Sequence, residues 1–474
     1  MALIKLFSKI DPKELRVFLL VILGQMICVL GIIVVLSWSG GDFLNTRNTL
    51  PVFGPDSEGY YQAAKNFLEH GHFSLSTSEP LLPMSFRTPG YPFFVALIWY
   101  IFGNVQVLIF IQLIISAISA VLIYRLAREL LTDKLAMVVS VVAFLEPSVA
   151  YYSGLLLSET LFTFFLVFGV YIYVNIFLKD KTESQLLFLL VGLVLGVTTL
   201  VRPIAQFLPI VFMSWGFIWL IFNKKFRSIP YLLWVLIGFI VVLTPLLVRN
   251  HNVFNEWSVS SVASYNLYNY NAPMFYSYQQ GVSFEEGRNY FRSKVKIEEQ
   301  LMMMSLYKAN ELKTVALEYI STDWASYAWF HFVKSLPFFF TDGLRDVSQQ
   351  VGLNDGSLPN ISDYILKQDI RGLIKALVVS PLNMMLFIVG ALFWASIIVG
   401  MSIGLFYFRP GVKKQWLLVV FLVMIVGYFG FLTGPVANAR FRVPVTPLMF
   451  ITAFYGYNLI ISIYRNGKMK KIHD

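Results

Sequence analysis

Cysteine and charge are both scarce in this chain of 474 residues. Cys28 is the only cysteine, so no disulfide forms within the chain, and segments outside a membrane must fold without one. Only 14% of the residues are charged, whereas 57% are hydrophobic and the mean hydropathy is +0.67. Because a soluble domain of this length needs a larger charged surface, the composition indicates a membrane protein.

Several motifs of soluble enzymes are also missing. The chain has no Walker loop, no Gly-x-Ser-x-Gly elbow and no dinucleotide fingerprint. It has no clear internal repeat, which disfavours a transporter, because many transporters are built from duplicated halves.

The net charge is +10, but most of the excess lies in short loops between apolar runs, where it orients membrane helices. We therefore expect membrane lipids as partners, and no nucleic acid.

Apolar runs of about twenty residues recur along the chain, and a helix of that length crosses a bilayer. They predict an all-α polytopic membrane protein with about ten transmembrane helices. The first run is too long for a signal-peptide core and has no small-residue cleavage site, so we interpret it as an uncleaved anchor. The predicted spans are Val17–Trp38, Val105–Tyr124, Leu135–Tyr152 (interrupted at Glu146-Pro147), Leu155–Leu178, Leu186–Val201, Ile204–Phe222, Tyr231–Val248, Leu382–Phe408, Trp416–Thr433 and Val443–Tyr464.

The charge of the connections assigns the two sides of the membrane. With the N-terminus inside, the inner connections are short and basic, as the positive-inside rule requires. These connections lie at 125–134, 179–181, 224–227 and 409–414. The outer side then receives the two longest segments between spans. The predicted parts are an N-terminal membrane module (1–249) with a catalytic first outer loop (39–104), an extracytoplasmic and interfacial section (250–381), and C-terminal membrane helices with a short cytoplasmic tail (382–474).

The two outer segments have distinct compositions. In the first loop we predict a helix over Tyr60–Glu69 and a short interfacial helix over Phe93–Phe102. In the outer section, Asn266–Gln280 is rich in Tyr and Asn, which is typical of irregular loops that contact polar ligands. The spacing over Phe284–Leu317 predicts helix, and the aromatic, amphipathic Trp324–Phe340 predicts a helix lying flat at the interface.

The first outer loop is too long to be a mere connector. Long loops tend to be functional or disordered, and the aromatic content of this one argues against disorder. Asp56 precedes its predicted helix and is a candidate general base, because transfer of a sugar to a hydroxyl needs a group that takes the proton. The alternative is that Asp56 only caps the helix. Glu58 is more typical of a solvated residue.

Glu159 lies at the start of the fourth predicted span, where a carboxylate is costly and needs a reason. It is a candidate for binding an acceptor or a sugar hydroxyl, and the alternative is a side chain that reaches back to the outer interface. Glu146, before Pro147, is a weaker candidate that satisfies backbone groups at a helix break. We group Glu159 with Tyr60, Tyr61 and Glu58 as candidates for acceptor or sugar binding.

Five arginines near predicted outer span ends lie where the charge rule does not place them: Arg87, Arg202, Arg249, Arg440 and Arg442. Arginine holds phosphate oxygens in a bidentate manner and stays charged. A lipid phosphate would leave as an anion and would need cations aimed at its developing charge. The alternative is pairing with lipid headgroups, or with Asp56 and Glu159 themselves. The candidates for lipid-phosphate binding are Arg87, Arg202, Arg440 and Arg442.

The sequence predicts no definite metal site. His70 and His72 are more typical of polar loop residues than of metal ligands. A divalent cation held by Asp56 and Glu159 stays possible.

Four motifs resemble the GT-C superfamily of polytopic glycosyltransferases, in the bacterial branch similar to protein O-mannosyltransferases and the lipid A aminoarabinose transferase. They cover residues 15–250 well and 250–375 only loosely. They are Asp56-x-x-x-Tyr60-x-x-Ala63 with Gly71-x-Phe73 and Arg87-x-Pro89-Gly90-Tyr91-Pro92; Glu146-Pro147 followed by Ser158-Glu159-Thr160; Arg202-Pro203; and Arg440-Phe441-Arg442-Val443-Pro444.

The resemblance implies that Asp56 is the catalytic aspartate and that Glu159 is a second acidic position. It implies a polyprenyl- or dolichyl-phosphate sugar donor, inversion at the anomeric carbon, and an active site on the outer face of a bacterial inner membrane. The mannosyltransferases often carry an Asp-Glu pair where Ser57 follows Asp56 here, and no large C-terminal soluble domain is expected. Both departures leave the acceptor open among lipid, glycan and protein.

The residues and the resemblance leave two candidate functions, an enzyme and a transporter. The first is a glycosyltransferase in which Asp56 deprotonates an acceptor hydroxyl while Arg202, Arg440 and Arg442 receive the lipid phosphate. The second is a transporter or flippase of lipid-linked sugars. A transporter predicts charges near the middle of spans, whereas most charges here lie at predicted outer span ends.

Overall fold

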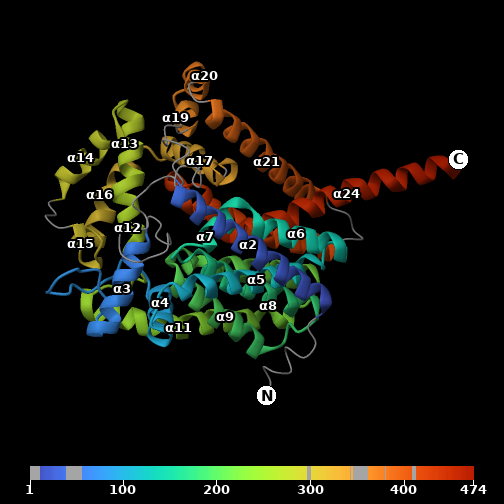
Figure 1. Ribbon diagram of the computed structural model, residues 1–474, viewed down its shortest axis with the longest axis horizontal. Coiled ribbons are helices and arrows are strands. Elements are labelled where there is room, and N and C mark those ends of the chain that lie inside the picture. Colours follow the sequence, from blue (N-terminus) through green and yellow to red (C-terminus); the bar gives the residue numbers. More distant parts are fainter. Residues whose placement is uncertain are drawn as a thin grey trace.

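The computed structural model describes residues 11–38, 56–295, 300–341, 343–344, 361–378, 381–407 and 413–473. Long apolar helices form the main body (Figure 1). The helices of the first outer loop and much of the outer section gather at the left of the view, and the last helix runs to the right-hand edge (Figure 1). The predicted all-α polytopic fold is therefore confirmed.

Eight helices in the described part of the chain are long and apolar enough to cross a membrane, and a bent pair would make a ninth. A further apolar helix, α9, has 17 residues, so the count agrees with the ten predicted spans. The long helices are α2 (Pro12–Trp38), α5 (Val107–Ala127), α8 (Glu159–Leu178), α9 (Gln185–Val201), α10 (Leu208–Phe222), α11 (Leu233–Phe254), α21 (Pro381–Phe406), α22 (Lys413–Thr433) and α24 (Thr446–His473).

The third predicted span is broken where the sequence places Glu146-Pro147. Helices α6 (Asp133–Leu145) and α7 (Pro147–Ser153) meet at an angle of 60°. Glu146 caps α7, accepting hydrogen bonds from the backbone nitrogen of Val149 at 3.0 Å and from the hydroxyl of Ser148 at 3.1 Å. Its side chain thus satisfies backbone groups at the break, as predicted.

Close backbone approach and aromatic packing join the spans. Helices α9 and α11 pack so tightly that a Cβ on Gly192 would lie 2.1 Å from the carbonyl oxygen of Val235, so only glycine fits there. Trp215 of α10 donates its indole hydrogen to the carbonyl of Leu417 in α22 at 2.7 Å. These contacts set the relative heights of the helices and hence of their ends.

Ion pairs gather at the end of the bundle that the sequence predicts as inner. Arg125 at the end of α5 pairs with Glu14 at the start of α2, at 2.7 Å. Arg128 pairs with Asp133 at the start of α6, also at 2.7 Å. Lys413, which begins α22, donates to the carbonyl of Phe222 at the end of α10 at 2.5 Å. Charged side chains of the basic connections therefore tie neighbouring helix ends together.

The first outer loop contains α3 (Ser57–His70) and α4 (Gly90–Phe102), close to the predicted helices. The turn before α4 packs on the end of α9, where a Cβ on Gly90 would lie 2.6 Å from the carbonyl group of Leu200. This approach brings the residues just before Gly90 close to the residues just after α9. Residues 39–55 of the loop lie outside the described residues.

The outer section corrects one prediction. Residues 266–280 are helical rather than irregular, running through α12 (Val262–Asn266), a π-helical turn (Leu267–Asn271) and α13 (Ala272–Gln280). The reason is packing, because Tyr268 and Phe275 are buried in an aromatic cluster with Phe291 and Phe330. The other predicted helices appear as α14 (Phe284–Lys294), α15 (Gln300–Met303), α16 (Ala309–Ser321) and α17 (Trp324–Phe340), followed by α19 (Ile361–Leu366) and α20 (Ile370–Val378).

Candidate active site

Asp56 stands immediately before α3, at the position of a helix cap, but its side chain makes no capping hydrogen bond. Instead, Oδ1 accepts from Arg87 Nη2 at 3.0 Å and Oδ2 accepts from Arg440 Nη1 at 2.6 Å. The interpretation of Asp56 as a simple cap is therefore wrong. Both of its oxygens belong to an electrostatic cluster.

Arg440 connects the two candidate acids. It lies on α23 (Ala439–Arg442), a single turn before α24, and its Nε donates to Glu159 Oε1 at 2.5 Å. Glu159 is the first residue of α8 and is 0% exposed. A fully buried carboxylate does not reach back to the interface, so that alternative for Glu159 is also wrong.

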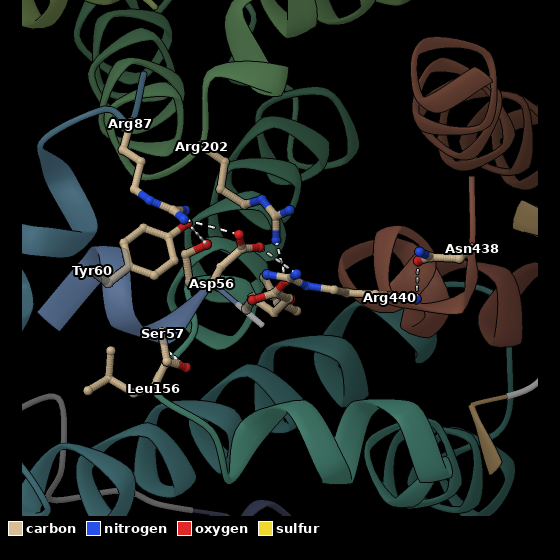
Figure 2. Close-up of polar contacts among 11 residues, drawn as sticks. Asp56, Ser57, Tyr60, Arg87, Leu156, Arg202, Asn438 and Arg440 are labelled. Atoms are coloured by element: carbon tan, nitrogen blue, oxygen red, sulfur yellow. Dashed lines mark hydrogen bonds and ion pairs between the residues drawn. The ribbon is translucent and has the colours of Figure 1, made fainter. Parts of the chain in front are cut away.

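Arg202 completes the cluster from the end of α9. Its Nη1 lies 2.7 Å from Glu159 Oε1 as an ion pair, although without the geometry of a hydrogen bond. The five charges thus form a chain in which acids and arginines alternate. The chain runs Arg87, Asp56, Arg440, Glu159 and Arg202. Figure 2 shows Arg87, Arg202 and Arg440 reaching the neighbourhood of Asp56 from different elements.

Exposure distinguishes the members of this cluster. The side chain of Asp56 is 39% exposed, whereas those of the three arginines are only 12–14% exposed. Asp56 is therefore the most exposed charged group of the cluster. Three arginines pair with two carboxylates, so the cluster carries one positive charge that its own acids do not neutralise.

The arginines control the pKa of Asp56. Partial burial alone would raise that pKa, but the positive charges of Arg440 and Arg87, together with their hydrogen bonds, lower it well below its usual range. The carboxyl group is therefore ionised and firmly paired in this arrangement.

Tyr60 and Ser57 attach α3 to the segment before α8. Tyr60 lies within hydrogen-bond distance of the Ser158 hydroxyl, at 3.0 Å, and Ser57 donates to the carbonyl of Leu156 at 2.9 Å (Figure 2). The guanidinium of Arg87 lies 4.1 Å above the ring of Tyr60, an arrangement that stabilises a cation. Tyr60 is buried, so it supports Arg87 rather than presenting a surface to solvent.

Glu58 and Tyr61 occupy different positions from Tyr60. Glu58 is exposed on the first turn of α3. Tyr61 stacks on Trp99 of α4, with 4.9 Å between ring centroids. Tyr61 therefore packs α3 against α4, while a role of either residue in binding an acceptor stays a prediction.

Arg442, predicted to bind phosphate with the others, is not brought to the cluster. Its guanidinium donates to the carbonyls of Phe338 and Thr341 at 2.6 and 2.5 Å. It also lies 3.4 Å above the ring of Trp394, and the residue is 1% exposed. The pairing of Arg442 with a lipid phosphate is therefore not supported by its position.

Among the described residues, no group of three or more His, Cys, Asp or Glu side chains is arranged to hold a metal ion. His72 Nδ1 lies 2.7 Å from the carbonyl of His70. The guanidinium of Arg440 lies between Asp56 and Glu159, at the position that a cation shared by the two carboxylates would occupy.

Sequence reasoning missed two supporting residues. Asn438 caps α23 by accepting from the backbone nitrogen of Arg440 at 3.0 Å, and an asparagine just before a short helix is a usual capping signal. Trp394 of α21 lies under Arg442, and its position in the middle of an apolar span gave no such signal.

One known enzyme family matches part of the chain. The family model described as dolichyl-phosphate-mannose-protein mannosyltransferase matches residues 86–248, less than half of the chain. That region contains Arg87, Glu159 and Arg202, but not Asp56 or Arg440. No curated protein matches the chain.

Solved structures of an oligosaccharyltransferase from Archaeoglobus fulgidus also resemble it. One is AglB with an inhibitory peptide and a dolichol-phosphate, at 14% identity and a TM-score of 0.47, covering 96% of this chain and 52% of that chain. A second, with Zn and sulfate, has 13% identity and a TM-score of 0.48, covering 94% and 51%. The chain thus spans about half the length of these solved proteins. The resemblance to GT-C glycosyltransferases that the motifs predicted is confirmed by the mannosyltransferase family model over residues 86–248.

Proposed function

We propose that this protein is an integral membrane glycosyltransferase that moves a sugar from a polyprenyl-phosphate donor to a hydroxyl group on the outer face of the membrane. The acceptor is a lipid, a glycan or a protein. The observation that carries this proposal is the cluster in which an accessible aspartate lies among three nearly buried arginines. A base and a phosphate-binding site are thereby combined in one place.

The unmatched positive charge supports phosphate binding. Buried polar groups are normally hydrogen-bonded, yet Arg87 Nε has no hydrogen-bond partner within the described residues, and Arg202 Nη1 meets Glu159 only as an ion pair without hydrogen-bond geometry. Both are N–H donors on arginines, whose fork geometry suits phosphate oxygens. A phosphate leaving group departs as an anion, so these donors stabilise it without a general acid.

The arginines that bind Asp56 are also the ones proposed to bind phosphate. While Arg87 and Arg440 pair with Asp56, its lowered pKa makes it a weak base. Donor phosphate competes for the same guanidinium groups, and each contact it gains loosens a contact of Asp56. The released carboxylate then accepts the proton of the acceptor hydroxyl, whose oxygen attacks the anomeric carbon as the bond to phosphate breaks. A single displacement of this kind inverts the anomeric centre.

Glu159 has two tasks in this proposal. Its Oε1 holds Arg440 and Arg202 in place. Its Oε2 is buried and has no hydrogen-bond partner among the described residues, so it is free to accept from a sugar hydroxyl. Glu159 thus orients the arginines while it binds the donor sugar.

A divalent cation bridging Asp56 and Glu159 does not fit the residues in this arrangement. Arg440 already contacts both carboxylates, and a shared cation would have to displace it. The solved oligosaccharyltransferase contains Zn, but we assign no step here to a metal.

Charge placement supports an outward-facing position of the cluster. The cluster is built from the start of α3, the start of α8, the end of α9 and α23, all at ends opposite to the basic connections. Because basic connections face the cytoplasm, we place the cluster on the outer side, in a bacterial inner membrane.

Transfer by the purified protein tests this function. Wild-type protein in proteoliposomes receives a polyprenyl-phosphate sugar with label in the sugar, and a membrane extract supplies hydroxyl acceptors. We expect release of polyprenyl phosphate and label on an acceptor. Movement of intact labelled lipid across the bilayer without release would instead show a transporter or flippase.

A further inference from the structure

Arg440, the arginine that contacts both acids, is carried by an unusually short element. Helix α23 has only four residues. One helical turn is not stable by itself, because ordering its backbone costs more free energy than its hydrogen bond contributes. Its position is therefore fixed by contacts outside the helix and by the 3-10 turn Val443–Val445, which joins it to α24. Asn438 supplies one of them at the N-terminal end.

Arg442 supplies the contacts at the other end of α23. Its guanidinium donates to the carbonyls of Phe338 and Thr341 and lies 3.4 Å above the ring of Trp394. With 1% exposure it is among the largest fully buried side chains described. A buried guanidinium with two carbonyl partners and an aromatic face fixes its own backbone firmly.

The two arginines of α23 point in different directions. Residues two positions apart on an α-helix project about 200° apart around its axis. Arg440 reaches Asp56 and Glu159 on one side, and Arg442 reaches α17 and α21 on the other. Arg442 therefore fixes α23 against α17 and α21, while Arg440 on the opposite side contacts Asp56 and Glu159.

The partners of Arg442 lie at a helix C-terminus. Phe338 belongs to the last turn of α17, and Thr341 is its C-cap. The last carbonyls of a helix lack partners within it and carry partial negative charge. Arg442 satisfies two of these groups, so one side chain caps α17 and fixes α23.

We propose that Arg442 is a positioning residue that places Arg440 for binding the lipid phosphate, by tying α23 to the end of α17 and to Trp394. This inference rests on the proposed function. Through this contact, helix α17 of the outer section sets the geometry of the phosphate site without touching the substrate.

A double-mutant cycle tests the inference, because residues that act through one another are not additive. The probe is polyprenyl phosphate, titrated into wild type, Arg440→Gln, Arg442→Gln and the double variant in nanodiscs, with the melting temperature of each recorded. We expect Arg442→Gln to weaken binding about tenfold in wild type and by less than about twofold in the Arg440→Gln background. A purely structural role would lower the melting temperature and weaken binding by the same factor in both backgrounds, which overturns the inference.

Two further variants test the same contact if Arg442→Gln does not fold. Arg442→Lys keeps the charge but loses the two-carbonyl fork, and Trp394→Leu removes the ring below Arg442. Each is expected to weaken binding in wild type and to have little effect beside Arg440→Gln. Additive effects would overturn this inference alone, whereas absence of any polyprenyl phosphate binding by wild type would overturn the proposed function with it.

Discussion

Arg440 Nη1 donates to Asp56 Oδ2 across 2.6 Å, although the two residues are 384 positions apart in the chain. The same guanidinium donates through Nε to Glu159. One side chain thus joins the loop before α3, the start of α8 and the turn before α24. In the proposed function, a phosphate that binds Arg440 shares it with both carboxylates, so we expect donor binding to be linked to release of Asp56.

Arg202→Gln removes one of the three proposed phosphate ligands. A charge-assisted hydrogen bond contributes about 1.5–3 kcal/mol, so we expect at least about tenfold weaker binding of polyprenyl phosphate, measured by titration in nanodiscs. Arg128→Gln is the matched control, because Arg128 pairs with Asp133 at the opposite end of the bundle. Equal affinities of the two variants would argue against a role of Arg202 in binding phosphate.

Glu159→Gln leaves Arg202 without its counter-charge and leaves Arg440 paired with Asp56 alone. Breaking a buried ion pair by removing one partner costs about 3–5 kcal/mol, so we expect a clear fall in the melting temperature. Glu311→Gln is the control, because Glu311 forms an exposed pair with Lys308, and such pairs contribute about 0–1 kcal/mol. A melting temperature of Glu159→Gln equal to that of the control would show that Glu159 is not needed to compensate the arginines.

The pH dependence of stability reports on Asp56. Its pKa is lower in the folded protein than in the unfolded chain, because Arg440 and Arg87 favour the ionised form. The stability that it contributes is complete above the unfolded pKa of about 4 and is lost as the pH falls toward the lowered folded value. The melting temperatures of wild type and Asp56→Asn should therefore differ most near pH 7 and converge below about pH 4. A difference in melting temperature that stays constant as the pH falls below about 4 would contradict the ion pairing.

Gly59→Ala tests the space around Arg87. A Cβ at this position would lie 2.9 Å from Arg87 Nε, so the guanidinium must shift. This shift loosens the hydrogen bond of Arg87 to Asp56, a charge-assisted contact of a kind that contributes about 1.5–3 kcal/mol, and we expect turnover to fall about fivefold or more. Gly427→Ala is the control, because its Cβ would meet nothing within 4 Å in helix α22. Unchanged turnover in Gly59→Ala would mean that Arg87 has more freedom than its contacts indicate.

Much of this architecture could be predicted from the sequence. Apolar runs specify the spans, because a bilayer fixes their length. Asp56, Glu159, Arg202 and Arg440 stood out because charges at span ends are costly and because the basic loops assign all four to one side. The structure brings these four together with Arg87.

Two features could not be predicted, for physical reasons. Arg442 follows Arg440 by two positions, and sequence does not reveal that a one-turn helix directs the two side chains to opposite sides. Residues 266–280 have the composition of a loop, and composition alone does not show which of their aromatic side chains are buried. The aromatic cluster that contains Tyr268 and Phe275 makes this segment helical. In both cases, tertiary contacts outweigh the local pattern.

Asp56→Asn is the most direct test of the central claim that Asp56 is the catalytic base. The assay follows release of polyprenyl phosphate from a labelled polyprenyl-phosphate sugar. Glu69→Gln is the control, because Glu69 is an exposed carboxylate on α3, the helix that follows Asp56. Loss of a general base costs about 10²–10⁴-fold, so we expect that fall in turnover for Asp56→Asn while donor still binds, and none for Glu69→Gln. Turnover of Asp56→Asn equal to wild type would contradict the account.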